Sequence, residues 1–267
     1  MFSVTNLLFA LLLASALSAL ALWRRALTPG GLALAWTLGV VIAFCGGLTG
    51  FLALTAVFLC TIAAGKLSGA RRERIEKRLH AKTGRRDAAQ VACNVATGAA
   101  LLLFYALTGW RGFLWAAGGA LAASLADSMA SELGVLAKAE PRDILSGKPV
   151  PRGLSGGVTA FGFGMSALGA AIVAGICALG WPGGWALFAS LTLAGTLGAA
   201  LDSVLGSAVQ AKYRCPACGA LTEKPLHCSV PGTVERGAAW MTNDLVNLSN
   251  NLFGALAAIG LYALLGR

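Results

Sequence analysis

Charged side chains are scarce in this sequence. Lys, Arg, Asp and Glu together make up 12% of its 267 residues, whereas soluble domains carry about 25%. With 57% hydrophobic residues and a mean hydropathy of +0.73, the chain lacks the polar surface that a water-soluble fold of this size needs. This scarcity excludes a soluble globular domain, and repeated apolar runs of roughly 20 residues indicate transmembrane helices instead.

Two further features that the sequence lacks narrow the range of possible functions. The G-x-x-x-x-G-K-[ST] motif does not occur, which excludes a phosphate-binding loop of that type. The net charge of +10 would suit nucleic acid, yet no platform of interleaved aromatic and basic residues accompanies it. The positive charge follows the pattern of membrane topology, so we expect no nucleic-acid partner.

The apolar residues form eight segments and predict an all-α, polytopic transmembrane helix bundle, folded as a single membrane domain over residues 1–267. No Lys or Arg precedes the first segment, and Arg24 and Arg25 follow it, which favours a retained helix over a cleaved signal peptide. The second and third segments are short, so we expect them to be tilted or partly re-entrant. The segments span about residues 3–23, 31–46, 49–65, 88–109, 113–137, 157–180, 184–210 and 239–264.

Basic residues are concentrated in alternate connections. Nineteen of the 21 Lys and Arg residues fall in residues 24–30, 66–87, 138–157 and 211–238. By the positive-inside rule we expect these connections on the cytoplasmic side of the cytoplasmic (inner) membrane, with both termini outside. The basic loop 66–87 is interpreted either as an anchor at anionic lipid or as an attractor of phosphorylated substrates.

Acidic residues within apolar segments are candidates for a functional site. Only 11 acids occur in the chain, and Asp127, Glu132, Asp202 and Asp244 lie in or beside such segments. Ser128, Ser131, Ser203, Asn243 and Asn247 accompany them in polar stripes at helical spacing. Lipid cannot satisfy such stripes, so we expect them to meet near the cytoplasmic interface. There Asp127, Asp202 and Asp244 would hold Mg²⁺, couple a proton or Na⁺ to transport, or bond helices together.

The Gly-rich loop 138–157 supplies the complementary charge. Glycine permits backbone conformations in which successive amides point at one anion. We expect the pair Gly156 and Gly157 to open a helix, whose N-terminus favours phosphate. The alternative interpretation is an ordinary connector. The predicted phosphate-binding residues are Lys148, Arg152, Ser155, Gly156 and Gly157.

The Cys/His loop 211–238 contains Cys215, Cys218, His227 and Cys228. A C-x-x-C pair followed by further Cys or His residues is typical of a structural Zn²⁺ site. A redox pair and unliganded thiols are the alternatives. His227 and Cys228 are adjacent, so the local backbone decides whether both reach one ion.

Four segments in this order resemble the DUF92 family, also called the transmembrane protein 19 family. They are residues 126–134 (ADSMASELG), 152–158 (RGLSGGV), 198–206 (GAALDSVLG) and 243–247 (NDLVN). The Cys/His loop also resembles an insertion that many members carry. Two positions depart from the family pattern: Ser128 stands where Thr is usual, and residues 153–157 read GLSGG in place of a Gly-Thr-Asn-Gly-Gly style loop.

This resemblance implies an activity. One plant plastid member is a phytyl-phosphate kinase, and these proteins are similar to CTP-dependent lipid kinases and cytidylyltransferases of membranes. The resemblance therefore implies phosphoryl transfer from a nucleoside triphosphate to a prenyl monophosphate within membrane lipid. Two other hypotheses stay open: an ion- or proton-coupled transporter or flippase for a lipid or small solute, and a non-catalytic membrane scaffold.

Overall fold

The computed structural model describes residues 3–79 and 84–265, which are mainly helical. The helices are α1 (Val4–Trp23), α2 (Pro29–Leu79), α3 (Ala88–Val91), the π-helical turn η1 (Ala92–Ala96), α4 (Thr97–Thr108), α5 (Gly112–Gly134), α6 (Ala160–Gly180), α7 (Gly184–Ala208) and α8 (Asn243–Leu265). Short antiparallel strands lie in two connections. They are β1 (Arg142–Asp143) with β2 (Gly157–Val158), β3 (Lys212–Arg214) between β4 (Leu221–Thr222) and β7 (Thr233–Arg236), and β5 (Leu226–His227) with β6 (Val230–Pro231).

Helix α2 reverses direction at Gly47, whose backbone is not helical (φ 65°, ψ −161°). A Cβ at Gly50 would lie 3.1 Å from the Ile42 carbonyl oxygen, and one at Gly39 would lie 3.9 Å from Leu54 Cδ2. In a straight helix, positions eight and fifteen residues apart are separated by roughly 12 and 22 Å along the axis. The two halves of α2 therefore lie side by side, and only glycine adopts the turning conformation readily.

Within the described residues, seven stretches are long and apolar enough to cross a membrane. The second, Pro29–Ala70, has 42 residues, about twice the roughly 20 that one crossing needs. Its halves on either side of Gly47 correspond to the predicted segments 31–46 and 49–65. The predicted all-α polytopic bundle is confirmed, with two of the expected segments joined in one folded-back helix.

The basic stretch expected as loop 66–87 is largely helical where it is described. Helix α2 bends at Gly69 (φ 49°, ψ −137°) and continues to Leu79. Arg, Lys, Glu and Leu are strong helix formers, so this composition extends the helix beyond its apolar part. Residues 80–83 of the expected loop lie outside the described residues.

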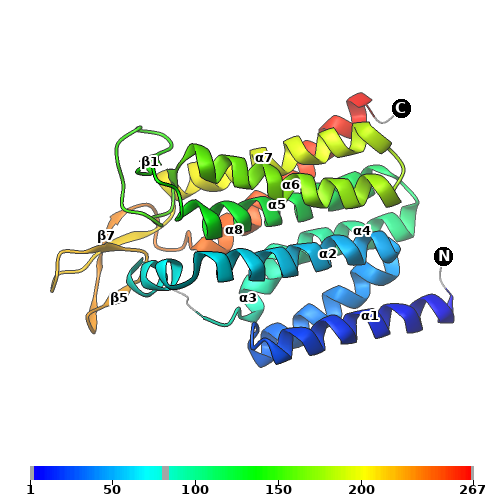
Figure 1. Cartoon of the computed structure of the whole chain (residues 1–267), viewed down its shortest axis with the longest axis horizontal. Helices are drawn as coiled ribbons and strands as arrows, with labels where there is room; N and C mark the ends of the chain where they lie inside the picture. Colours follow the sequence, from blue (N-terminus) through cyan, green and yellow to red (C-terminus); the bar gives the residue numbers. More distant parts are fainter. Residues whose placement is uncertain (1–2, 80–83, 266–267) are drawn as a thin grey trace.

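The two ends of the bundle differ in character (Figure 1). Both chain termini lie at one end, and the labelled strands lie at the other. The Gly-rich loop contains β1 and β2, and the Cys/His loop contains the remaining strands. The bundle therefore has a strand-bearing end, which is rich in basic residues, and an end where the chain starts and finishes.

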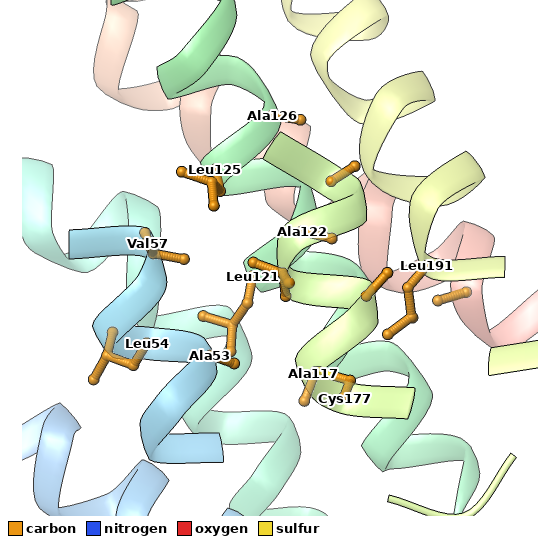
Figure 2. Packing of buried hydrophobic residues seen from close by; sticks show 14 of the residues in the cluster. Ala53, Leu54, Val57, Ala117, Leu121, Ala122, Leu125, Ala126, Cys177 and Leu191 are labelled. Carbon is orange, nitrogen blue, oxygen red and sulfur yellow. The ribbon is translucent and has the colours of Figure 1, made fainter. Parts of the chain in front are cut away.

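Helix α5 forms the centre of the bundle and packs against α2, α4, α6, α7 and α8. All of its residues from 114 to 126 are buried. Figure 2 shows Leu121 and Leu125 of α5 beside Val57 of α2, with Cys177 of α6 and Leu191 of α7 on the other side. This position leaves the C-terminal turns of α5 facing the strand-bearing end.

Small residues let the helices approach closely. A Cβ at Gly254 of α8 would lie 2.7 Å from both the Gly119 carbonyl oxygen and Ala123 Cβ of α5. A Cβ at Gly195 of α7 would lie 2.9 Å from the Ala122 backbone. Membrane helices associate through such small-residue contacts, which draw the polar parts of α5, α7 and α8 together.

Candidate functional site

A cavity of about 610 Å³ lies at the strand-bearing end of the bundle. Its walls come from α5, α6, α7, α8, the segment 84–94, the Gly-rich loop and the Cys/His loop. The cavity brings together all four acids singled out in the sequence: Asp127, Glu132, Asp202 and Asp244. It is also lined by the accompanying residues Ser128, Ser131, Ser203, Asn243 and Asn247, and by Arg152, Ser155, Gly156 and Gly157.

Two acids reach the cavity from the last turns of α5. Ser131 Oγ donates a hydrogen bond to Asp127 Oδ1 at 3.4 Å, four residues along the same helix face. Glu132 lies beside α2, because a Cβ at Gly65 would be 3.5 Å from its Oε2 atom. Ser128 is buried in the same wall. Asp127 and Glu132 therefore occupy different sides of the cavity.

Asp202 occupies an unusual environment on α7. Its Oδ2 atom is buried and, among the described residues, has no hydrogen-bond partner. The carboxylates of Asp127 and Glu223 are close enough to act on Asp202 by charge repulsion. A buried carboxylate oxygen without a donor is costly unless a proton or a cation compensates it. The three acids together favour positive charge at this point.

The carboxylates line the cavity without closing on a single point. Among the described residues, no three acidic side chains bring their oxygens as close together as a closed metal cage requires. This open arrangement suits Mg²⁺, which is commonly held by one or two carboxylates and completes its shell with waters and substrate phosphates. Asp127, Asp202 and Asp244 are the candidates to supply those one or two carboxylates.

The polar stripe of α8 divides into two parts. Asn243, Asp244 and Asn247 line the cavity. Further along, Asn250 Nδ2 donates to the Ala123 carbonyl at 3.2 Å, and Asn251 Nδ2 donates to the Cys93 carbonyl at 2.6 Å. The first part of the stripe faces the site, while the second bonds α8 to its neighbours.

Helix α3 and the π-helical turn η1 add two cavity residues that sequence reasoning missed, Gln90 from α3 and Asn94 from η1. Asn94 Nδ2 donates to the Gln90 carbonyl at 2.8 Å, and Ser124 Oγ lies 3.3 Å from Asn94 Oδ1. Single π-turns inside helices are frequent at functional sites. Gln90 and Asn94 are four residues apart within an apolar segment, and this spacing is the signal that could have revealed them.

The Gly-rich loop packs on the end of α7. Gly156 has φ +87°, and a Cβ there would lie 2.6 Å from the Ser207 backbone. The Ser155 amide donates to Glu223 Oε1 at 3.0 Å, so it already binds an anionic oxygen. The Gly157 amide donates to the Leu154 carbonyl at 3.0 Å. The expectation that this glycine pair opens a helix is wrong: Gly157 lies in β2, and α6 begins at Ala160 after the N-cap Thr159. Glycine is required at position 156 because the contact leaves no room for a side chain.

The comparisons with known proteins identify the family. Residues 12–255 match the family model described as integral membrane protein DUF92. The chain belongs to the DUF92 family. It is 30% identical to an uncharacterized membrane protein (sll0875) of a Synechocystis strain, over 90% of this chain and 84% of the relative. It is 29% identical to protein PGR of Arabidopsis thaliana, over 82% of this chain and 84% of that protein. No solved structure matches.

In this DUF92 protein the two predicted phosphate-binding cations lie in different places. The Arg152 guanidinium lines the cavity but donates to the carbonyls of Ala137, Lys138 and Ala139 at 2.7 to 3.1 Å, which braces the loop against the end of α5. Lys148 is exposed and, among the described residues, does not line the cavity. Arg86, which the sequence suggested only as part of a basic run, does line it.

The Cys/His loop contributes to the DUF92 cavity through its strands, which sequence reasoning also missed. Glu223 lines the cavity directly after β4. Lys212, at the start of β3, is buried and donates to the Ser155 carbonyl at 2.8 Å. Burial lowers the pKa of Lys212, while the charge of Glu223 acts in the opposite direction. Lys212 and Glu223 thus hold both backbone groups of Ser155.

A second missed residue, Asp143, anchors the Gly-rich loop from β1. This carboxylate is buried and accepts a hydrogen bond from Ser207 Oγ at 2.6 Å. It also accepts bonds from the amide and hydroxyl of Ser146, both at 2.8 Å. These bonds, with the one from Ser207 foremost, hold the pKa of Asp143 well below its usual range. The loop is therefore fixed to α7 by an ionised carboxylate.

The charge balance of the cavity is opposite to that of the protein. Among the residues that the structure describes, five carboxylates line it, including Glu223, against the two guanidinium groups of Arg86 and Arg152. The chain as a whole carries a formal charge of +10. An acidic cavity within a basic protein attracts cations, and a phosphate can enter it readily only together with a cation.

A smaller, mostly apolar cavity of about 260 Å³ adjoins the acidic one. It lies among α1, α2 and the start of α3, where Leu17, Leu54 and Phe58 line it. The two cavities share several lining residues: Gly84, Arg86, Gln90, Asn94 and Glu132. A polar site and an apolar pocket with a common wall fit an amphipathic ligand.

The predicted zinc ligands form a separate group in the Cys/His loop. One ligand atom from each of Cys215, Cys218, His227 and Cys228 lies within 4.8 Å of the others. Hydrogen bonding with His227 lowers the pKa of the Cys215 thiol to about 6. Hydrogen bonding with Cys218 raises the pKa of Cys228 to about 11. The backbone thus does bring His227 and Cys228 to one point.

Proposed function

We propose that this DUF92 protein is a membrane kinase that transfers a phosphoryl group from a nucleoside triphosphate to a prenyl monophosphate, a phytyl-like lipid. One observation carries the proposal: an acidic cavity, lined by carboxylates from three helices and by a Gly-rich loop, shares a wall with an apolar pocket. The polar cavity would receive the phosphates, and the apolar pocket would receive the first part of the prenyl chain.

The acids suit phosphoryl transfer because that reaction needs mainly positioning and charge neutralisation. Asp127, Asp202 and Asp244 would hold Mg²⁺, which neutralises charge on the phosphoryl oxygens. Asn243, Asn247 and Ser203 would orient waters or phosphate oxygens beside them, and Glu132 would act at the wall shared with the apolar pocket. Without Mg²⁺, the five carboxylates that line the cavity among the described residues would repel both substrates.

The reaction requires no protein nucleophile. An oxygen of the prenyl phosphate attacks the γ-phosphorus, a new P–O bond forms, the bond to the β-phosphate oxygen breaks, and nucleoside diphosphate leaves. Phosphate monoesters are largely ionised at neutral pH, so no general base is needed. The Ser155 amide binds a carboxylate oxygen in the structure, and the same kind of donor suits a phosphate oxygen. Arg86 would add positive charge at the junction of the cavities.

The activity is tested with purified protein in detergent, Mg²⁺, a panel of radiolabelled nucleoside triphosphates and several prenyl monophosphates. We expect labelled prenyl diphosphate from the wild type and none from Asp127→Asn, with both proteins monodisperse. Retained transfer in Asp127→Asn would remove Asp127 from its role. Absence of transfer with every nucleotide and lipid would refute the kinase proposal.

The location of the nucleotide substrate would also fix the orientation of the protein in the membrane. Nucleoside triphosphates are cytoplasmic, so the strand-bearing end would face the cytoplasm and both termini the outside of the cytoplasmic membrane. This agrees with the distribution of Lys and Arg. A reporter fused after Arg267 that is active only outside the cytoplasm should be active, and an inactive, folded fusion would reverse the orientation.

A cation- or proton-coupled transporter is the second candidate, because Asp202 has a buried carboxylate oxygen within a membrane helix. It predicts movement of substrate into proteoliposomes that depends on an ion gradient and proceeds without nucleotide hydrolysis. Nucleotide-dependent lipid phosphorylation in the same preparation would favour the kinase.

A further inference from the structure

The Cys/His loop forms a compact unit at the strand-bearing end, and its four sulfur and nitrogen atoms converge. His227 Nδ1 lies 3.5 Å from Cys218 Sγ and 3.3 Å from Cys228 Sγ. Cys215 Sγ contacts the carbonyl of the same histidine at 3.5 Å. A tetrahedral zinc site with Zn–S bonds of about 2.3 Å and a Zn–N bond of about 2.0 Å has S···N separations of roughly 3.5 Å. The observed separations fit that geometry.

The backbone explains how neighbouring residues can share one ion. Strands β5 and β6 are joined by Cys228 and Ser229, which both have positive φ (51° and 62°). Residues other than glycine adopt this conformation rarely and at a cost. The turn brings the Cys228 thiol back beside the His227 ring. The other two cysteines, Cys215 and Cys218, lie in the turn between β3 and β4. The Gly219 amide donates to the Cys215 carbonyl at 2.8 Å and closes this turn.

We propose that Cys215, Cys218, His227 and Cys228 form a structural zinc centre that joins the β3–β4 turn to the β5–β6 turn. Three thiolates and one imidazole complete a four-coordinate site, which leaves no open position for substrate. A disulfide between two of the thiols would account for only two of the four converging side chains. It would leave the positions of the third thiol and the imidazole unexplained. The centre is a closed, non-catalytic site.

The centre has a consequence for the acidic cavity. Strand β3 begins with Lys212 and β4 is followed by Glu223, and these two side chains hold the carbonyl and amide of Ser155. Thr222 Oγ1 and the Glu223 amide also donate to the Leu79 carbonyl at 2.9 and 2.8 Å, at the end of α2. Zinc at the turn therefore maintains the hairpin that fixes the Gly-rich loop and α2 around the cavity.

The test is the metal content of the full-length protein, purified in detergent without chelators and measured by inductively coupled plasma mass spectrometry. We expect about one zinc ion per chain in the wild type. Cobalt(II) substituted for zinc should give thiolate charge-transfer absorption in the near ultraviolet. Protein that contains no zinc and takes up neither zinc nor cobalt when monodisperse would overturn the proposal, whatever its enzymatic activity.

A matched pair of variants tests the ligands. Cys218→Ser should lower zinc content at least about tenfold, whereas Cys60→Ser, at a membrane-embedded cysteine of α2, should leave it unchanged. If Cys218→Ser fails to remain monodisperse, Cys228→His supplies a substitute ligand and should retain zinc. Equal zinc in Cys218→Ser and wild type would overturn the assignment of that ligand. Removal of zinc should also expose the Lys212–Glu223 hairpin to protease.

Discussion

The Ser155 amide donates a hydrogen bond to Glu223 Oε1 at 3.0 Å, although 68 residues separate the two positions. This bond joins the Gly-rich loop to the Cys/His loop at the acidic cavity, which both residues line. Lys212 holds the other side of the same residue through the Ser155 carbonyl. The cavity is therefore shaped by two connections that the helices alone would leave independent.

Replacement of Glu223 by alanine should loosen the Gly-rich loop. A hydrogen bond to a charged group contributes about 1.5–3 kcal/mol, so kcat/KM for prenyl-phosphate phosphorylation should fall by about ten- to one hundred-fold. Glu223→Gln retains an acceptor for the Ser155 amide and should have a smaller effect. Glu140→Ala, at an exposed acid, is the control. An activity of Glu223→Ala equal to the control would show that the bond does not shape the site.

Asp143 gives the Gly-rich loop a dependence on pH. Its pKa is lowered in the folded protein, chiefly by the bond from Ser207, so its ionised form stabilises the fold above the unfolded-state pKa of about 3.9. That contribution is lost as the pH falls below this value toward the lowered pKa. The difference in thermal stability between wild type and Asp143→Asn should thus be large near pH 7 and shrink with acidification. A difference that grows on acidification would contradict the assignment.

The apolar cavity should determine which prenyl chains are accepted. Ser18 on α1 lines this cavity, and its neighbour Ala19 is exposed and does not line it within the described residues. Ser18→Phe fills the cavity and should raise the KM for long prenyl phosphates by about tenfold or more, since a methylene in a hydrophobic pocket contributes about 1–3 kcal/mol. Ala19→Phe should leave the KM unchanged. Equal chain-length preference in the two variants would place the prenyl chain elsewhere.

Two glycines of α8 test how closely the helices pack. A Cβ at Gly254 would press on the Gly119 carbonyl, whereas a Cβ at Gly260 would meet no atom within 4 Å among the described residues. Gly254→Ala should lower stability by about 1–3 kcal/mol through overpacking. Gly260→Ala should be neutral or slightly stabilising, because alanine favours helix. Size-exclusion chromatography after heating in detergent measures how much of each variant stays monodisperse. Equal losses of monodisperse protein in the two variants would contradict the packing account.

Much of the fold could be predicted from the sequence because lipid imposes a strong rule on it. Apolar runs define the helices, and costly acids such as Asp127 and Asp202 stand out against them. The same contrast is missing in the connections, where polar residues are ordinary. Glu223 and Asp143 therefore had no signal, since their importance depends on contacts with Ser155 and Ser207 that only the folded chain creates.

The basic side chains near the cavity were equally difficult to predict from the sequence. The position of Lys148 and Arg152 in a Gly-rich loop, which is a local property of the sequence, predicts that they bind phosphate. The loop instead directs Arg152 to the carbonyls that follow α5 and leaves Lys148 exposed. Arg86 reaches the cavity from a distant connection. Sequence spacing predicts which helix face a residue occupies, but it does not predict which loop residue meets a site.

The proposed kinase requires that the acids of α5, α7 and α8 hold a divalent cation in one shared cavity. Electron paramagnetic resonance of Mn²⁺, added in place of Mg²⁺ together with a non-hydrolysable nucleotide, measures this binding. We expect bound Mn²⁺ in the wild type and in Glu140→Gln, and at least about tenfold weaker binding in Asp127→Asn and Asp202→Asn. Wild-type Mn²⁺ affinity in both of these variants would contradict the claim.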